Sequence, residues 1–256
     1  MRRLLRGWPA VLLVLGLIGV WELYVDLGGV DPLILSPPHA IAGTMYSDRS
    51  LLWSNFLVTA REVLFGLLLA AAAGFVCAIG IHLSATLRRA VYPLLVASQT
   101  IPIVILAPLL LFWFGFSIVS KLVVVALVSF FSIVVTTLDA LSAVDGDLLK
   151  LMKTFDAGRL RTFRHVELPA ALPGLLTGAK IAAVVAVIGA VFAEQQAADS
   201  GLGYLFFQSI PQLLTARAYA AVVILSLFAI ALFALLTLVE RLALPWAHTS
   251  RGDRRR

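Results

Sequence analysis

Six stretches of the sequence are each long and apolar enough to cross a lipid bilayer, and no other feature constrains the fold as strongly. A helical crossing needs about 20 mainly apolar residues. Hydrophobic residues make up 61% of the chain and the mean hydropathy is +1.00, whereas soluble domains are nearer ~45–50% apolar. The sequence therefore predicts an all-α, polytopic membrane protein of one domain, 1–256, with its core spans within 63–239. The six expected spans are Pro9–Leu27, Val63–Ile81, Val91–Phe114, Ile118–Leu138, Leu175–Ala193 and Ala218–Val239.

The positive charges orient these spans. Since Lys and Arg concentrate on the cytoplasmic side of membrane proteins, we expect both termini and the polar loop 145–173 to be cytoplasmic. The basic amino terminus before the first apolar run resembles a signal peptide, but no small-residue cleavage site closes that run, so we expect an uncleaved span. Fifteen of the twenty Lys and Arg fall on the cytoplasmic side: Arg2, Arg3, Arg6, Arg88, Arg89, Lys150, Lys153, Arg159, Arg161, Arg164, Arg241, Arg251, Arg254, Arg255 and Arg256.

Several kinds of chemistry have no support in the sequence. A phosphate-binding Gly-x-x-x-x-Gly-Lys-Ser/Thr loop is absent, so we expect that the chain does not hydrolyse nucleotide itself. Outside the membrane, no basic patch carries interleaved aromatic residues, which argues against nucleic-acid binding. The chain has one cysteine, and its histidines lack the spacing of metal ligands, so neither metal binding nor nucleophilic catalysis is expected. These residues are Cys77, His39, His82, His165 and His248.

The loop 145–173 carries a helical pattern. Leu160, Phe163 and Val166 recur at every third position, while basic residues occupy the other faces. This spacing predicts a short amphipathic helix with a positively charged wet side. Such a helix is either a docking element or a basic loop that merely obeys the orientation rule.

The third expected span contains polar residues and two prolines. Gln99 and Thr100 precede Pro102 and Pro108, and each proline removes a backbone hydrogen bond, so we expect a kinked helix that faces protein or a water-filled pathway. Gln99 either borders that pathway or bonds a neighbouring helix.

Charged residues inside the spans are few. We expect Asp139 and Glu240 at cytoplasmic span ends and Glu62 and Glu194 at external ones, which makes a proton relay improbable. Lys180 is the charge embedded most deeply in the membrane. Snorkelling of its ammonium to the cytoplasmic interface is favoured over contact with a substrate.

Several motifs, spaced along nearly the whole chain, together resemble the permease subunit of a bacterial binding-protein-dependent ATP-binding-cassette importer of the type I fold. Within this family the likeness is to the nitrate, sulfonate, taurine and thiamine-pyrimidine-precursor subgroup, and the stretches beginning at Lys180 and Glu240 look closest to the pyrimidine-precursor branch. The motifs are Pro93–Pro102, Ala107–Leu109, Trp113–Phe116, Gly158–Gly174, Gly178–Ala182, Ala190–Glu194, Gly201–Tyr204 and Glu240–Trp246.

The resemblance implies partners and a set of functional residues. It implies a second copy of the chain or a homologous permease, two ATPase subunits that carry ATP and Mg²⁺, a soluble or lipid-anchored binding protein, and location in the bacterial inner membrane. The chain itself is expected to bind no cofactor and to pass a small solute to the cytoplasm. The expected coupling residues are Gly158, Arg159, Leu160, Arg161, Phe163, Arg164, Val166 and Pro169. The expected pathway residues are Gln99, Thr100, Pro102 and Pro108, and the expected external-loop residues are Glu194, Gly201, Gly203 and Tyr204.

Two other functions make different demands on the sequence. An ion-coupled secondary transporter calls for paired mid-membrane carboxylates or an inverted repeat with broken helices, and the sequence gives a sign of neither. A membrane-embedded enzyme calls for clustered His, Asp or Cys, which the sequence also lacks.

The chain departs from the family at the start of the cytoplasmic loop. Lys150-Leu151-Met152 stand where the family has Glu-Ala-Ala, and Asp156 stands at the position of a glycine. Asp is among the few residues that tolerate a left-handed backbone, so we expect the helix to break there all the same. Because Lys150 replaces the family's glutamate, the loop lacks one acidic residue that the ATPase is expected to contact.

Overall fold

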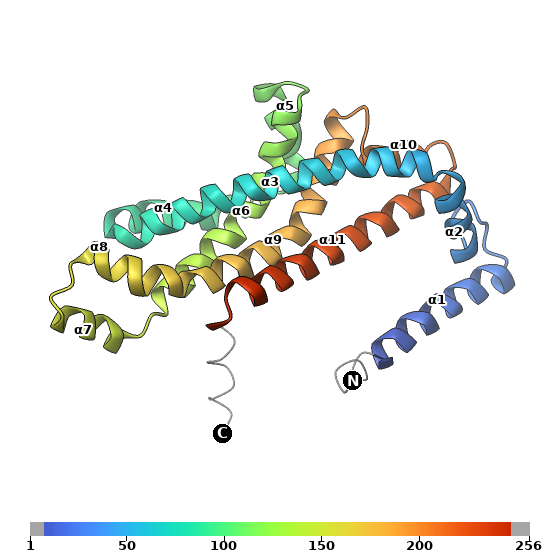
Figure 1. Ribbon diagram of the computed structural model, residues 1–256. Helices are drawn as coiled ribbons and strands as arrows, with labels where there is room; N and C mark the ends of the chain where they lie inside the picture. Colours follow the sequence, from blue (N-terminus) through green and yellow to red (C-terminus); the bar gives the residue numbers. More distant parts are fainter. Residues whose placement is uncertain (1–7, 247–256) are drawn as a thin grey trace. The chain divides into compact units, whose positions relative to one another are not determined.

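The computed structural model describes residues 8–246, and the described part of the chain is helical and contains no strand, as predicted (Figure 1). Five helices are long and apolar enough to cross a membrane, and a bent pair supplies a sixth crossing if it counts as one span. The elements are α1 (Trp8–Gly28), α2 (Pro38–Ser47), α3 (Arg49–Leu83), α4 (Ala85–Ser98), α5 (Ile103–Phe114), α6 (Ile118–Ser142), α7 (Gly146–Thr154), α8 (Arg159–Thr162), the π-helical η2 (Phe163–Glu167), α9 (Leu168–Ala197), α10 (Leu202–Ser209) and α11 (Thr215–Ala243).

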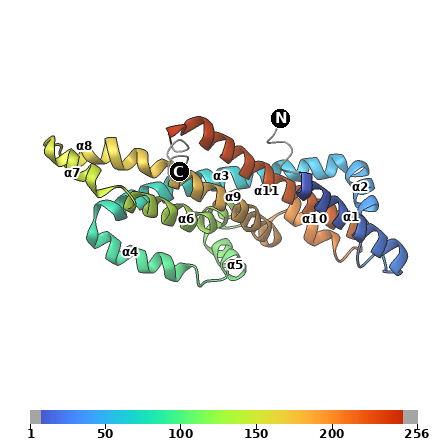
Figure 2. The ribbon, with the colours of Figure 1, turned by 90° about the horizontal axis from the view of Figure 1, so that it is seen from below.

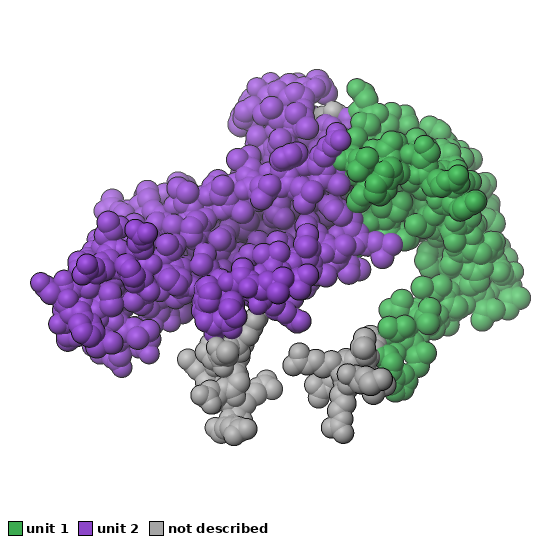
Figure 3. Space-filling model, viewed as in Figure 1, with its two compact units in different colours: residues 1–58, 199–226 green, residues 59–198, 227–256 purple. Residues whose placement is uncertain are grey.

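The chain forms two compact units (Figure 3). The smaller unit combines the first 58 residues with 199–226, and it holds α1, α2, α10 and the beginnings of α3 and α11. The larger unit combines 59–198 with the chain from 227 onward. The basic residues expected at the two ends of the chain, before 8 and after 246, lie outside the described residues.

The third expected span differs from the prediction. Instead of one kinked helix over Val91–Phe114, α4 ends at Ser98 and α5 begins at Ile103, with 108° between them (Figure 2). Pro102 explains the break, because its ψ of 129° is extended and its ring nitrogen cannot donate. Pro108, by contrast, lies inside α5 without ending it. Only one of the two prolines therefore interrupts the helix.

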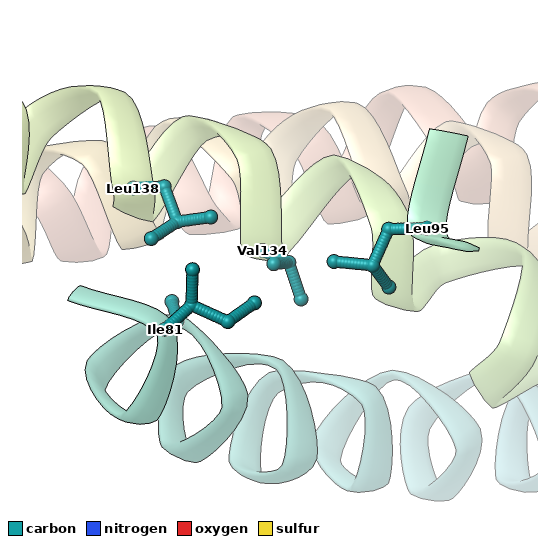
Figure 4. Packing of buried hydrophobic residues seen from close by; sticks show 5 residues of the cluster. Ile81, Leu95, Val134 and Leu138 are labelled. Carbon is teal, nitrogen blue, oxygen red and sulfur yellow. The ribbon is translucent and has the colours of Figure 1, made fainter. Parts of the chain in front are cut away.

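The larger unit is built around the pair α6 and α9. The helix α9 packs against α6, and several of its small residues are fully buried: Ala171, Ala182, Ala183, Ala186 and Ala190. Small side chains let two helix backbones approach closely, which is the usual way that helices associate within a bilayer. A second cluster packs α4 onto α3 and α6 through Ile81, Leu95, Val134 and Leu138 (Figure 4).

Gly178 is one of the positions where α9 approaches α6 very closely. A Cβ atom at this position would lie 2.8 Å from Ile133 Cα and 2.9 Å from Ser132 O, and both of these are backbone atoms that cannot turn aside. At Gly189, further along α9, the nearest atoms would be 3.5 Å away, which is ordinary contact.

We therefore expect Gly178→Ala to lower the free energy of unfolding by about 1–3 kcal/mol through overpacking. Gly189→Ala is the matched control and should leave stability unchanged or raise it by up to ~1 kcal/mol, since Ala favours helix. Thermal unfolding of the two purified variants in detergent measures the difference. Equal midpoints would mean that the two helices can separate at no cost.

Candidate coupling and pathway sites

The predicted short amphipathic helix of the cytoplasmic loop is not a separate element. α8 and η2 run directly into α9, so that 159–196 form one helix of 38 residues. Pro169 explains the π-helical stretch: a proline in a continuing helix has no N–H to donate, and the wider turn, in which Leu168 N–H donates to Phe163 O, accommodates it. The loop and the following span are thus continuous.

The apolar stripe is only partly available to a partner. Leu160 is 79% exposed, whereas Phe163 and Val166 are half-buried against the chain itself. Helix α7 and Phe155, which follows it, add exposed apolar side chains that we did not predict. Leu148, Leu151 and Phe155 are three and four residues apart, and this helical spacing could have predicted a common face. We call the exposed set the coupling face: Leu148, Leu151, Phe155 and Leu160.

Asp156 has the backbone conformation predicted for it. Its φ is +50°, in the left-handed region, and α7 ends just before it. Ala157 N–H closes the turn by donating to Met152 O at 3.0 Å. Lys150, at the family's acidic position, pairs with Asp147 at 2.8 Å on the same helix, and both side chains are exposed. Such a pair contributes little to stability.

Two contacts tie the coupling segment to the end of α3. Arg159 Nη2 donates to Leu83 O at 2.5 Å, and His82 Nε2 lies 3.2 Å from Glu167 Oε2. Arg161 and Arg164 are exposed, and Gly158 begins α8 in an extended conformation. The coupling segment is therefore anchored to two helices of the larger unit, α3 and α9, while its basic side chains stay accessible.

The predicted pathway residues gather at the break between α4 and α5. Gln99 caps the end of α4, directly after its last residue, and is exposed. Thr100 and Pro102 are exposed as well, whereas Pro108 is half-buried. The Thr100 hydroxyl donates to Ala97 O at 2.8 Å and so satisfies one carbonyl that the end of the helix leaves free. The break thus presents polar groups to the outside of the subunit.

The external-loop residues are well ordered within their own units. In the larger unit, Glu194 is fully buried and accepts a hydrogen bond from Thr59 Oγ1 at 2.5 Å. In the smaller unit, the Gly201 N–H donates to Asn55 Oδ1 at 2.7 Å, and its φ of +127° is a conformation open in practice to glycine alone. Gly203 is buried in α10, and the Tyr204 hydroxyl accepts from Gln208.

Two buried ion pairs join charged residues of the membrane-spanning helices. Lys121 Nζ lies 2.6 Å from Glu62 Oε1, with the side chains 11% and 1% exposed. Lys180, expected to snorkel, instead pairs with Glu240 Oε2 at 2.7 Å, and both are largely buried. The partners lie about 60 residues apart in the chain, so no local pattern reveals them. Glu62 and Glu240 are therefore each buried in an ion pair with a lysine, and these pairings were not predicted from the sequence.

Comparison with known proteins identifies the family. The model of the family described as "Binding-protein-dependent transport system inner membrane component" matches residues 63–244. The chain is 36% identical over 246 residues to the formylaminopyrimidine transport permease protein ThiX of Halalkalibacterium halodurans, covering 96% of this chain and 98% of that one. It is 34% identical to the riboflavin transport system permease protein RibX of Chloroflexus aurantiacus, with coverages of 93% and 91%.

Structural comparison finds a similar fold in a solved transporter. The fold resembles a chain of the inward-facing MetNI methionine ABC transporter with a TM-score of 0.62 and 19% identity, covering 75% of this chain and 97% of that one. Permease proteins named for aliphatic sulfonates, taurine and nitrate also match, so the predicted family and subgroup are confirmed. The chain therefore belongs to the inner membrane components of binding-protein-dependent transport systems and is the permease subunit of an ATP-binding-cassette importer.

Proposed function

We propose that this permease imports a pyrimidine-type precursor delivered by a binding protein. The observation that carries the proposal is the 36% identity to a formylaminopyrimidine permease over nearly the full length of both chains. The riboflavin permease, at 34% identity, is also named for a nitrogen heterocycle. Sulfonate, taurine and nitrate are the competing solutes, and relatives named for them are 24–29% identical.

The proposed assembly pairs two copies of the chain with two ATPase subunits, which bind ATP and Mg²⁺. The ATPases dock on the coupling face from the cytoplasm, both chain termini lie on that side, and the binding protein docks on the opposite side of the inner membrane. The basic residues around the coupling face support this orientation, because positive loops stay cytoplasmic. Among the described residues these are Arg88, Arg89, Lys150, Lys153, Arg159, Arg161 and Arg164.

Alternating access follows from the continuity of the coupling segment with its span. Closure of the ATPases displaces α8, and since 159–196 form one helix, the displacement reaches the external end of α9 without an intervening loop. Glu194 and Thr59 lie at that end. A pull on the coupling face is in this way converted into movement at the external side.

Reconstitution tests the proposal. The permease, co-purified with its ATPase and placed in proteoliposomes with its binding protein, should accumulate formylaminopyrimidine only when ATP is present. Omission of the ATPase or the binding protein serves as the control. Uptake driven by a proton or sodium gradient without ATP would favour a secondary transporter, and uptake of taurine in preference to the pyrimidine would refute the solute.

A crosslinking experiment tests the pathway. In a Cys77→Ala background, Gln99→Cys should form an intersubunit disulfide or bismaleimide link in at least one nucleotide state, because Gln99 is exposed at the break between α4 and α5. Leu94→Cys, exposed on another face of α4, is the control and should not crosslink. If the accessible Gln99→Cys thiol forms no link in any nucleotide state, Gln99 does not border the pathway between subunits.

A further inference from the structure

The smaller unit contains two adjoining, mainly apolar pockets, and the wall of one of them holds an ion pair. One pocket, of about 520 Å³, is walled almost entirely by apolar side chains, including Phe206 and Tyr219. The other, of about 360 Å³, is lined partly by the charged pair Asp48 and Arg217. Three residues line both pockets, namely Leu33, Leu213 and Thr215. The two spaces therefore share part of their walls; we call the first the apolar chamber and the second, after the ion pair in its wall, the charged chamber.

Aromatic residues of the kind that concentrate at membrane interfaces stand at the apolar chamber. Tyr219 in its wall packs edge-on against Trp21 of α1, with ring centroids 5.9 Å apart. Trp and Tyr concentrate at the level of the lipid headgroups because their rings are apolar and their polar tips are hydrated. The chamber also leaves large apolar side chains uncovered at its rim, among them Ile34, which is 73% exposed.

Leu213, which separates the two chambers, has an unusual backbone. Its φ is +59°, a left-handed conformation that costs energy in any residue with a Cβ. The turn that holds it is fixed by Leu213 N–H donating to Ile210 O and Leu214 N–H donating to Ser209 O. Glycine would relieve the strain, yet the chain places an exposed leucine there. Strained residues of this kind gather at ligand sites.

The charged chamber presents both signs of charge side by side. Arg217 Nε lies 2.7 Å from Asp48 Oδ2, and both side chains are about one-quarter exposed, so a ligand can reach them. A neutral ligand that carries its own cation and anion matches such a pair better than a ligand with a single charge. Zwitterionic phospholipids have such a headgroup, with the acyl chains attached next to it.

We propose that the two pockets form one binding site for a zwitterionic phospholipid of the phosphatidylethanolamine class. An acyl chain fills the apolar chamber past Phe206 and Leu213. The headgroup lies in the charged chamber, its phosphate facing Arg217 and its ammonium facing Asp48. A lipid held here links the loop 29–37 to the loop 210–214, both of which line the pockets.

Lipid retention by the purified full-length permease tests the site. The protein is exchanged into detergent containing equal amounts of phosphatidylethanolamine and phosphatidylglycerol, and the bound lipid is measured by native mass spectrometry. Wild type should retain phosphatidylethanolamine over phosphatidylglycerol by about five-fold or more, given the contribution of one charge near a headgroup. Asp48→Asn with Arg217→Gln should abolish the preference, whereas Arg61→Gln, an exposed arginine of the larger unit, should preserve it.

Two further variants separate loss of binding from loss of fold. Val222→Trp fills the apolar chamber, and Ile34→Asp places a charge at its exposed rim, where folding does not depend on it. Both should lose the bound lipid with an unchanged thermal unfolding midpoint. Absence of any preference in wild type overturns the proposal. So does a set of variants that keep the lipid but no longer bind the binding protein, because the pockets would then be a protein-docking surface.

Discussion

Lys121→Met is expected to destabilise the permease more than any other single substitution considered. It leaves Glu62 buried with no positive charge beside it, and removing one partner of a buried ion pair costs about 3–5 kcal/mol. Glu62 Oε2 has no hydrogen-bond partner among the described residues. Thermal unfolding in detergent, with yield of folded protein as a second measure, reports the effect.

The double variant Glu62→Gln with Lys121→Met separates the ion pair from simple packing. Since it removes both charges, it should recover most of the lost stability. Lys150→Met is the matched surface control, because its partner Asp147 is exposed, and it should cost less than about 1 kcal/mol. A double variant as unstable as Lys121→Met would show that the loss comes from packing around Lys121 and not from charge.

A second large effect is expected at the coupling face. Leu160→Asp and Phe155→Asp should each abolish co-purification of the ATPase and ATP-driven uptake, because a carboxylate replaces a large apolar side chain whose burial contributes about 1.5–3 kcal/mol. That loss weakens binding by about 10- to 100-fold. Leu160 and Phe155 are 79% and 71% exposed in the subunit, so the membrane domain should fold normally.

Lys153→Asp provides the control for this experiment. It introduces the same carboxylate on α7, but on the side opposite Leu148, Leu151 and Phe155, as the helical spacing dictates. ATPase association should survive in this variant. Full transport activity in both Leu160→Asp and Phe155→Asp would show that the ATPase engages another surface.

Much of the fold could be predicted because the bilayer imposes it. A span must be apolar over about 20 residues and must satisfy its own backbone, so hydropathy alone indicated helices and their approximate positions. The left-handed conformation of Asp156 was also predictable, since the resembled family has a glycine at this position and Asp is one of the few other residues that tolerate such a backbone. Such features depend on local sequence, and local sequence is what a single chain reveals.

The features that were missed depend on distant contacts. The partners Lys121 and Glu62, or Lys180 and Glu240, are far apart in the chain, and no periodicity indicates that they meet. The break between α4 and α5 at Pro102 could not be predicted, because the sequence does not show which of the two prolines, Pro102 or Pro108, a helix accommodates. Likewise, Phe163 and Val166 had the spacing of an exposed stripe, but the larger unit covers part of it.

The close contact of α6 with α9 has a mechanical consequence. On the α9 side of this contact, alanine and glycine have no flexible side chain that could rearrange to let one helix slide over the other, and protein interiors are densely packed. We therefore expect the two helices to move together as one rigid body. We expect bending within the larger unit to concentrate at the segment 99–102, because the helix is interrupted there between α4 and α5.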